Sequence, residues 1–132
     1  MQMNNTFPGG KRVDASAGSF TIASDQSAES GGEGSAPEPY TLFLASLGTC
    51  AGIYVLRFCQ SRGLSTEGLA LTQTMEWDEA AHKLSRVRLD IHLPRGFPDK
   101  YRDAVIRAAD QCAVKRTILE PPEFIVTAAP SP

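Results

Sequence analysis

The residues with the clearest capacity for chemistry are three cysteines, Cys50, Cys59 and Cys112. A thiolate is a strong nucleophile, and an odd number of cysteines is a poor match to a structural disulfide framework. Each thiol therefore needs its own explanation. Cys50 is the most unusual, because it follows Ala, Ser, Gly and Thr in "LASLGTC" within a segment, Pro39 to Leu56, that carries no charge.

Spacing limits which thiols could cooperate. Cys59 follows Cys50 by nine positions, which is about half a turn around a helix at ~100° per residue, so these two side chains face opposite ways. If one pair cooperates, it is Cys50 with Cys112. The alternative is that the cysteines only pack, because a buried free cysteine commonly behaves as a small hydrophobe.

Other chemistries have little support in the sequence. The two histidines, His82 and His92, form no H-x-x-x-H pair, and the cysteines form no C-x-x-C pair, so no metal site is predicted. There is no G-x-S-x-G elbow, and "GGEG" does not connect a strand to a helix as a phosphate-binding loop does. We predict no cofactor. A net charge of -2 without a basic stripe argues against a nucleic-acid partner.

The size of the chain predicts one globular domain. With 132 residues, 42% of them hydrophobic, it can bury one modest core. We expect a flexible N-terminus over residues 1–10, a single domain over 11–128 and a C-terminal tail over 129–132. The N-terminal sequence lacks the basic start and apolar run of a secretory signal, which predicts a cytoplasmic protein with reduced thiols.

The longest predicted element is a helix from Pro39 to Arg62. A Ser35-x-x-Glu38 capping pattern precedes it and Gly63 follows it. It is long enough to raise the question of a membrane span, but it contains Thr, Ser and Gly, and no second apolar stretch lies beside it. We predict no membrane. Because its sides are apolar until the last turn, it should be a central helix covered by a sheet or another chain. Small residues that would let a neighbour approach its backbone are Gly48, Ala51 and Gly52.

The remaining elements are shorter. "KRVDAS" and "SFTIAS" predict a hairpin, and "LALTQTMEW" and "RVRLDIHL" predict a second one joined by "DEAAHK". A helix from Pro98 to Ala109 should break at Asp110 and Gln111 and restart in "CAVKRTILE", before a last strand "EFIVTA". The loop "SAESGGEGSAPEP" is unusually long, which suggests mobility or function. This order predicts an α+β fold with a mostly antiparallel sheet.

Three segments resemble a known family. "APEPYTLFLASLGTC" resembles the Pro-x-x-Leu-x-Leu-Ala-Ser-Leu-Gly-x-Cys segment of the OsmC/Ohr family, and "AADQCAVKRTI" resembles its Ala-x-x-Cys-(Pro/Ala)-Val signature. "SDQSAESGGEG" is similar to its Asp-x-x-x-x-x-Gly-Gly stretch. The resemblance covers roughly Lys11 to Ala128. It implies an OsmC-like fold that forms an intertwined homodimer, with a long apolar helix in the centre and active sites at the interface.

The same resemblance implies an activity. Members that work as thiol-dependent peroxidases reduce organic or hydrogen peroxides in the response to oxidative stress. By position, Cys50 would be the peroxidatic thiol and Cys112 the resolving one, and an external dithiol would reduce the resulting disulfide. The alternative is an OsmC-like protein without peroxidase activity that senses oxidants or binds a small apolar ligand. A third possibility is a structural domain whose cysteines only fill space.

A buried thiolate needs a stabilising partner, because burial alone raises the pKa of a thiol. The family supplies an arginine from the N-terminal hairpin, which points to Arg12 and, as a second choice, Lys11. The alternative is that both are solvated charges at a strand end.

The family's glutamate near the start of the long helix is missing here. Tyr40 or Thr41 stands at its position, and the nearest acid, Glu38, comes one or two residues early. Tyr40 could donate a hydrogen bond to a thiolate or a peroxide oxygen, so Tyr40 and Glu38 are the predicted substrate-binding residues. Glu38 could equally be a helix cap.

Overall fold

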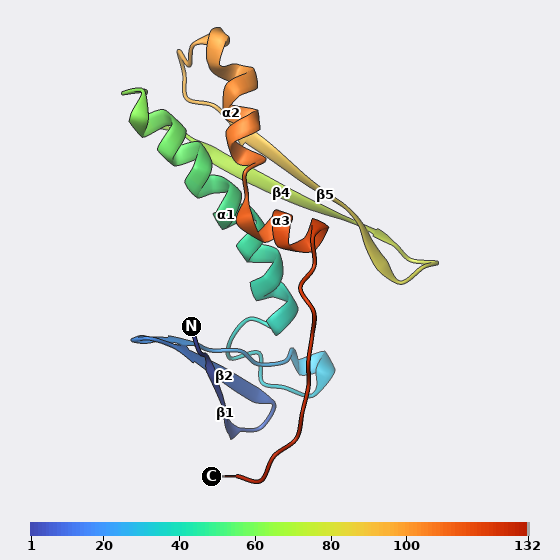
Figure 1. Ribbon diagram of the computed structural model, residues 1–132. Helices are drawn as coiled ribbons and strands as arrows, with labels where there is room; N and C mark the ends of the chain where they lie inside the picture. The colour runs from blue at the N-terminus through green and yellow to red at the C-terminus, as the bar shows by residue number, and fades with distance from the viewer. Residues whose placement is uncertain (132) are drawn as a thin grey trace. The chain divides into compact units, whose positions relative to one another are not determined.

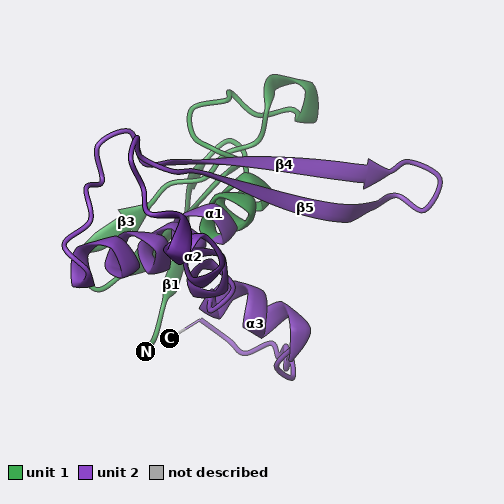
Figure 2. Cartoon of the chain, turned by 90° about the horizontal axis from the view of Figure 1, so that it is seen from above, with its two compact units in different colours: residues 1–46 green, residues 47–132 purple. Residues whose placement is uncertain are grey.

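The computed structural model describes residues 1–131. The chain packs as two compact units, Met1–Ser46 and Leu47–Pro132 (Figure 2). The elements are helices and antiparallel strands, which confirms the predicted α+β class. The single domain over residues 11–128 stays a prediction. The last residue of the predicted tail over 129–132 lies outside the described residues.

The first unit contains a three-stranded antiparallel sheet in the order β1 (Asn4–Gly9), β2 (Arg12–Ala17) and β3 (Phe20–Ile22). The predicted hairpin is β2–β3, and Gly18 between them has φ +59°, a conformation that glycine adopts without strain.

Strand β1 lies within residues 1–10, the segment for which the sequence predicts a flexible N-terminus. Its residues Asn4 to Thr6 pair with Asp14 to Ser16 of β2. This strand was not predicted, because "NNTFPG" shows no apolar alternation and Pro8 is unfavourable inside a strand. The irregular register between Thr6 and Gly9 accommodates that proline at the edge of the sheet.

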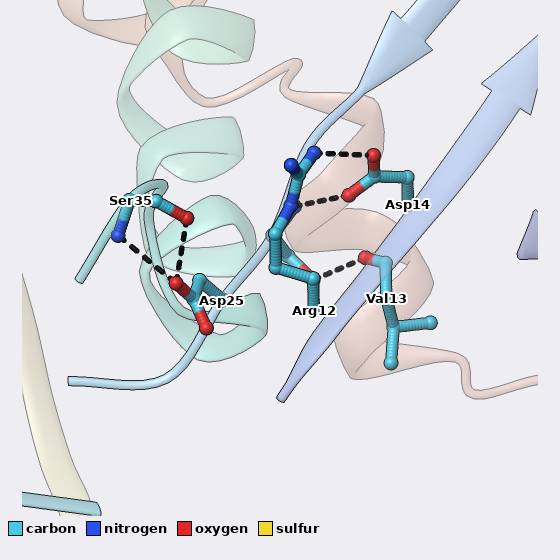
Figure 3. A network of polar contacts seen from close by, with 6 residues as sticks. Arg12, Val13, Asp14, Asp25 and Ser35 are labelled. Carbon is cyan, nitrogen blue, oxygen red and sulfur yellow. Dashed lines mark hydrogen bonds and ion pairs between the residues drawn. The ribbon is translucent and has the colours of Figure 1, made fainter. Parts of the chain in front are cut away.

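The long loop after β3 is organised around Asp25, which is buried at 1% exposure. Its carboxylate accepts hydrogen bonds from the Ser35 hydroxyl (2.6 Å) and the Ser35 N–H (3.0 Å) (Figure 3). It also accepts one from the Gln26 N–H (2.8 Å). These donors, the Ser35 hydroxyl first, lower the pKa of Asp25 to about 2. The Ser35 hydroxyl is thus bonded to Asp25, and this differs from the predicted capping role.

The same loop explains the Asp-x-x-x-x-x-Gly-Gly stretch. A short 3-10 helix, η1 (Ala28–Ser30), ends at Gly31 in the left-handed region with φ +85°. A side chain on Gly32 would overlap the carbonyl of Gln26 and come within 2.9 Å of Oδ1 of Asp25. Both glycines are therefore required by the backbone path around the buried carboxylate.

Helix α1 (Pro39–Ser61) matches the predicted long helix to within one residue. It ends where Gly63 takes φ +62° and the Leu64 N–H bonds back to the Cys59 carbonyl at 2.9 Å. By length and composition the helix could cross a membrane, but the core helix of a soluble protein meets the same criterion.

The core of the second unit lies between α1 and the elements that follow it. Strands β4 (Ala70–Asp78) and β5 (Lys83–His92) form the predicted hairpin. After it come η2 (Asp99–Tyr101) and α2 (Arg102–Ala109), which together occupy the predicted helix over 98–109. In Figure 1 the part of α1 beyond Leu47 runs along the hairpin with α2 beside it. The buried cluster is Val55, Phe58, Cys59, Phe97 and Val105.

Close approach to the α1 backbone occurs at one of the predicted glycines. A Cβ on Gly48 would lie 2.5 Å from Oε1 of Gln73 on β4, whereas a Cβ on Gly52 would meet nothing within 4 Å in the described chain. Ala51 between them is completely buried. The hairpin therefore covers one side of α1 at Gly48.

The end of the chain contains one confirmed element and one correction. Helix α3 (Ala113–Leu119) restarts after Asp110 and Gln111, as predicted. The predicted strand over 123–128 is wrong, because no strand is formed there. The composition of "EFIVTA" suits a strand, but a strand also needs a hydrogen-bonding neighbour, which the second unit does not offer this segment. Its apolar side chains stay exposed, with Val126 at 94%.

Candidate functional site

The structure brings Cys50 and Cys112 together within the second unit. Cys50 lies on α1 and is partly exposed, and Cys112 directly precedes α3 and is only 2% exposed. The Cys112 side chain is within hydrogen-bonding reach of the Cys50 sulfur, and both thiols are free. This is the pair that spacing favoured.

Backbone amides at the start of α3 point at the Cys50 sulfur. The N–H of Val114 is the largest cause of a lowered pKa for Cys50, and the Cys112 side chain and the N–H of Ala113 add to it. Partial burial opposes the shift. The first amides of a helix have no partner within the helix, so here they are free to stabilise negative charge on the sulfur.

Cys112 itself caps α3. Its sulfur accepts a hydrogen bond from the Lys115 N–H at 3.4 Å, and its S–H donates toward the Leu47 carbonyl at 3.8 Å. Because Leu47 lies about one turn before Cys50 on α1, Cys112 is held to the same stretch of helix as its partner thiol. An ion pair of 2.6 Å between Lys115 and Asp110 ties the turn before α3 to its first turn.

The groups that lower the pKa of Cys50 all belong to the second unit. The causes are the two amides and the Cys112 side chain, without a charged group. Arg12 opens β2 in the first unit and forms an ion pair with Asp14, with 2.6 Å between Nη2 and Oδ2 (Figure 3). Lys11 lies exposed in the turn before it. A catalytic role for Arg12 stays a prediction.

The two predicted substrate-binding residues also belong to the first unit. Tyr40 lies in the first turn of α1, 47% exposed, with its ring centroid 5.5 Å from that of Phe43. Glu38 precedes the helix, and its carbonyl accepts the Leu42 N–H at 3.2 Å. Thr41 follows Tyr40 on the helix. Their roles toward a substrate stay predictions.

The third cysteine is part of the core. Cys59 is completely buried beside Val55 and Phe58. Burial raises the pKa of its thiol, and the positive charge of Arg62 only partly offsets that effect. A neutral, inaccessible thiol is a poor nucleophile, so Cys59 is not a candidate for the same chemistry.

The histidines occupy unrelated places in the second unit. His82 lies in the β4–β5 turn with φ +50°, and the ring of His92 is 2.7 Å from the Thr72 hydroxyl. Among residues 1–131, no group of three or more His, Cys, Asp or Glu side chains is arranged to hold a metal ion.

Sequence reasoning missed the amides that surround the cysteines. The donors are main-chain groups of Ala113, Val114 and Lys115, and a side-chain motif does not reveal where they point. The only available signal was the position of Cys112 directly before the predicted helix restart. That signal is weak, because cysteine is not a usual N-cap residue.

Comparisons with known proteins place this arrangement in a wider context. The sequence model of the OsmC-like protein family matches residues 32–127. No curated protein sequence matches the chain.

Several solved structures share the fold. An osmotic stress induced and detoxification response protein from Psychrobacter arcticus 273-4 superposes with a TM-score of 0.74 at 20% identity, over 89% of this chain and 87% of that one. An OsmC-like protein from Mycoplasma pneumoniae gives 0.68 at 13% identity, over 91% and 87%. An organic hydroperoxide resistance protein OsmC from Legionella pneumophila gives 0.57 at 19% identity, over 89% and 87%.

Proposed function

The chain belongs to the OsmC-like protein family, and on that premise we propose that it is a thiol-dependent peroxidase acting through Cys50 and Cys112. The observation that carries the proposal is a partly exposed thiol with a lowered pKa that contacts a second, buried thiol. A peroxidatic cysteine must be ionised and accessible, and a resolving cysteine must be within reach of it.

The proposed reaction has two steps on the protein. The Cys50 thiolate attacks one peroxide oxygen and the O–O bond breaks, so that an alcohol or water leaves with a proton and Cys50 becomes a sulfenic acid. The Cys112 thiol then attacks the oxidised sulfur. The S–O bond breaks, water leaves, and a Cys50–Cys112 disulfide forms. An external dithiol returns both residues to thiols and is itself oxidised to a disulfide.

The surroundings of Cys50 favour an organic peroxide over a water-like one. Within the second unit, the exposed neighbours of Cys50 on α1 include Ile53, which is 38% exposed, and this side of the helix carries no charge until Arg57. The Legionella pneumophila protein is named for resistance to organic hydroperoxides. We assign Tyr40, Glu38 and Arg12 to this reaction as proposed contacts of the peroxide and the thiolate.

We also propose that the working form is a homodimer in the cytoplasm with the active sites at its interface. In the apolar stretch of α1, only 28% of the residues are buried in the described chain. The segment after α3 exposes Phe124, Ile125 and Val126 at 83%, 75% and 94%. Burying such surface against a second copy is favourable by roughly 25 cal/mol per Å².

Peroxide consumption in the presence of dithiothreitol tests the proposed activity. We expect wild type to turn over cumene hydroperoxide, Cys50→Ser to be inactive, and Cys112→Ser to lose sustained turnover. Cys59→Ala is the matched control and should keep the wild-type rate. Equal rates in wild type and Cys50→Ser would refute the proposed enzyme.

One observation favours a redox sensor as the second candidate. The chain has Tyr40 or Thr41 where the family's carboxylate stands, and a weaker catalyst could still record an oxidant. A sensor would form the Cys50–Cys112 disulfide once and turn over slowly with dithiothreitol, whereas an enzyme would cycle.

A further inference from the structure

The two sulfurs of the site differ in how an external thiol can reach them. We infer that the reductant attacks the Cys50–Cys112 disulfide at the Cys50 sulfur, and that Cys112 is always the leaving group. The inference rests on the proposed function, because it needs that disulfide to form. It adds the direction of the reductive half-reaction.

Access favours attack at Cys50. Cys50 is partly exposed on α1, whereas Cys112 is 2% exposed between α1 and α3. A disulfide joins sulfurs about 2.05 Å apart, so two thiols that are already in contact can be linked with little movement. In the disulfide we therefore expect the Cys50 sulfur to stay partly exposed and the Cys112 sulfur to stay buried. Thiol–disulfide exchange requires a thiolate to approach one sulfur directly. Only the Cys50 side offers that approach in the second unit.

Leaving-group stabilisation favours the same direction. In this step the reductant thiolate forms a new S–S bond with Cys50, the Cys50–Cys112 bond breaks, and its electron pair stays on the Cys112 sulfur. That sulfur is in position to accept the Lys115 N–H at 3.4 Å. A leaving thiolate that receives a hydrogen bond departs more readily, because exchange is faster when the leaving thiol is more acidic.

The second step releases Cys50. A second thiolate of the reductant attacks the reductant sulfur bound to Cys50, which closes the reductant disulfide and leaves the electron pair on the Cys50 sulfur. There the N–H groups of Val114 and Ala113 donate hydrogen bonds that stabilise the negative charge on the Cys50 sulfur. The two steps of the reduction therefore use neighbouring amides of one helix turn: the Lys115 N–H stabilises the leaving Cys112 thiolate, and the Val114 N–H stabilises the Cys50 thiolate that starts the next cycle.

The test traps the first step in the oxidised protein. One equivalent of cumene hydroperoxide is added to the Cys59→Ala variant, which removes exchange through the third thiol, and peptide mapping verifies the disulfide. Excess glutathione is then added for increasing short times before acid quenching and alkylation with N-ethylmaleimide. Trypsin cleavage after Arg57 separates the Cys50 and Cys112 peptides.

Extrapolated to zero time, glutathione should be found on Cys50 and N-ethylmaleimide on Cys112, with a preference of about tenfold or more, as expected when one sulfur is accessible and the other is not. Glutathione on Cys112, or an even distribution, would overturn the inference and leave the peroxidase proposal intact. Failure to form any Cys50–Cys112 disulfide with peroxide would overturn both.

Discussion

The N–H of Val114 on α3 points at the sulfur of Cys50 on α1, and it is the largest single cause of the lowered pKa of that thiol. The stabilisation comes from the main chain of a seven-residue helix, so it depends on where α3 is held. Cys112 fixes that position through the Lys115 N–H and the Leu47 carbonyl. Cys112, the proposed resolving thiol, and the stabilising amides are therefore parts of one structural feature.

Removing an amide from this turn should raise the pKa of Cys50. Ala113→Pro deletes one N–H at the first position of α3, where proline is tolerated. The preceding Cys112 already has ψ 117°, which suits a residue before proline. We expect less thiolate near neutral pH and a slower peroxide reaction that recovers at alkaline pH, as measured by the pH dependence of iodoacetamide alkylation in a Cys59→Ala background.

The matched control is Ala113→Ser, which keeps the amide and should leave the alkylation profile in place. If Ala113→Pro and Ala113→Ser titrate alike while circular dichroism shows α3 intact, the amides do not stabilise the thiolate and this explanation of the pKa is wrong.

The lowered pKa of Cys50 also predicts how stability depends on pH. The folded protein favours the thiolate more than the unfolded chain does, so this contribution is fully present above the unfolded pKa and is lost as pH falls through the folded pKa. The stability advantage of wild type over Cys50→Ser should therefore grow with rising pH. Urea unfolding of both proteins from about pH 6 to about pH 10 measures it, and a constant or shrinking difference would contradict the sign.

Much of the fold could be predicted because local sequence determines it. The bounds of α1 follow from Pro39, Gly63 and the apolar run between them, and the β4–β5 hairpin follows from its alternating pattern. Two elements were missed for non-local reasons. Strand β1 exists because β2 pairs with it, and the strand predicted over residues 123–128 has no such neighbour.

The candidate site could be predicted in part. The pairing of Cys50 with Cys112 followed from helix geometry and a family resemblance, since Cys59 faces away into the core. The need for a stabilised thiolate was also clear. The groups that stabilise the thiolate could not be predicted, because the sequence "CAVKRTIL" does not indicate which way the amides of Ala113 and Val114 point.

The loop around Asp25 should be destabilised when the negative charge of Asp25 is removed. Both carboxylate oxygens of Asp25 accept hydrogen bonds, one from the Gln26 N–H and the other from the Ser35 hydroxyl and N–H. In Asp25→Asn one of these oxygens is replaced by an NH2 group, which cannot accept, so at least one hydrogen bond is lost in a buried place. We expect a clear fall in melting temperature. The depressed pKa means that the stabilisation by Asp25 is present above 3.8 and is lost as pH falls through about 2.

The difference in melting temperature between wild type and Asp25→Asn should therefore shrink in that acidic range. Glu29→Gln, an equal change of charge at an exposed position of the same loop, is the control and should leave the melting temperature nearly unchanged. Similar behaviour of the two variants would show that Asp25 does not organise the loop.

The exposed apolar segment near the C-terminus should matter for assembly and little for the single chain. Replacing Phe124, Ile125 and Val126 by serine removes apolar surface that is at least 75% exposed. We expect the proposed dimer to dissociate, with the monomer's free energy of unfolding altered by less than about 0.5 kcal/mol, as is usual for surface positions. Analytical ultracentrifugation measures the assembly, and a dimer of unchanged affinity would exclude this segment from the interface.

The most direct test of the proposed peroxidase is a thiol count after one equivalent of cumene hydroperoxide is added to the reduced protein. The chain contains three free cysteines. We predict that Cys59 alone remains reactive after denaturation, and that peptide mapping finds an intrachain Cys50–Cys112 disulfide that dithiothreitol reverses. Three persistent thiols, or a disulfide that involves Cys59, would contradict the account.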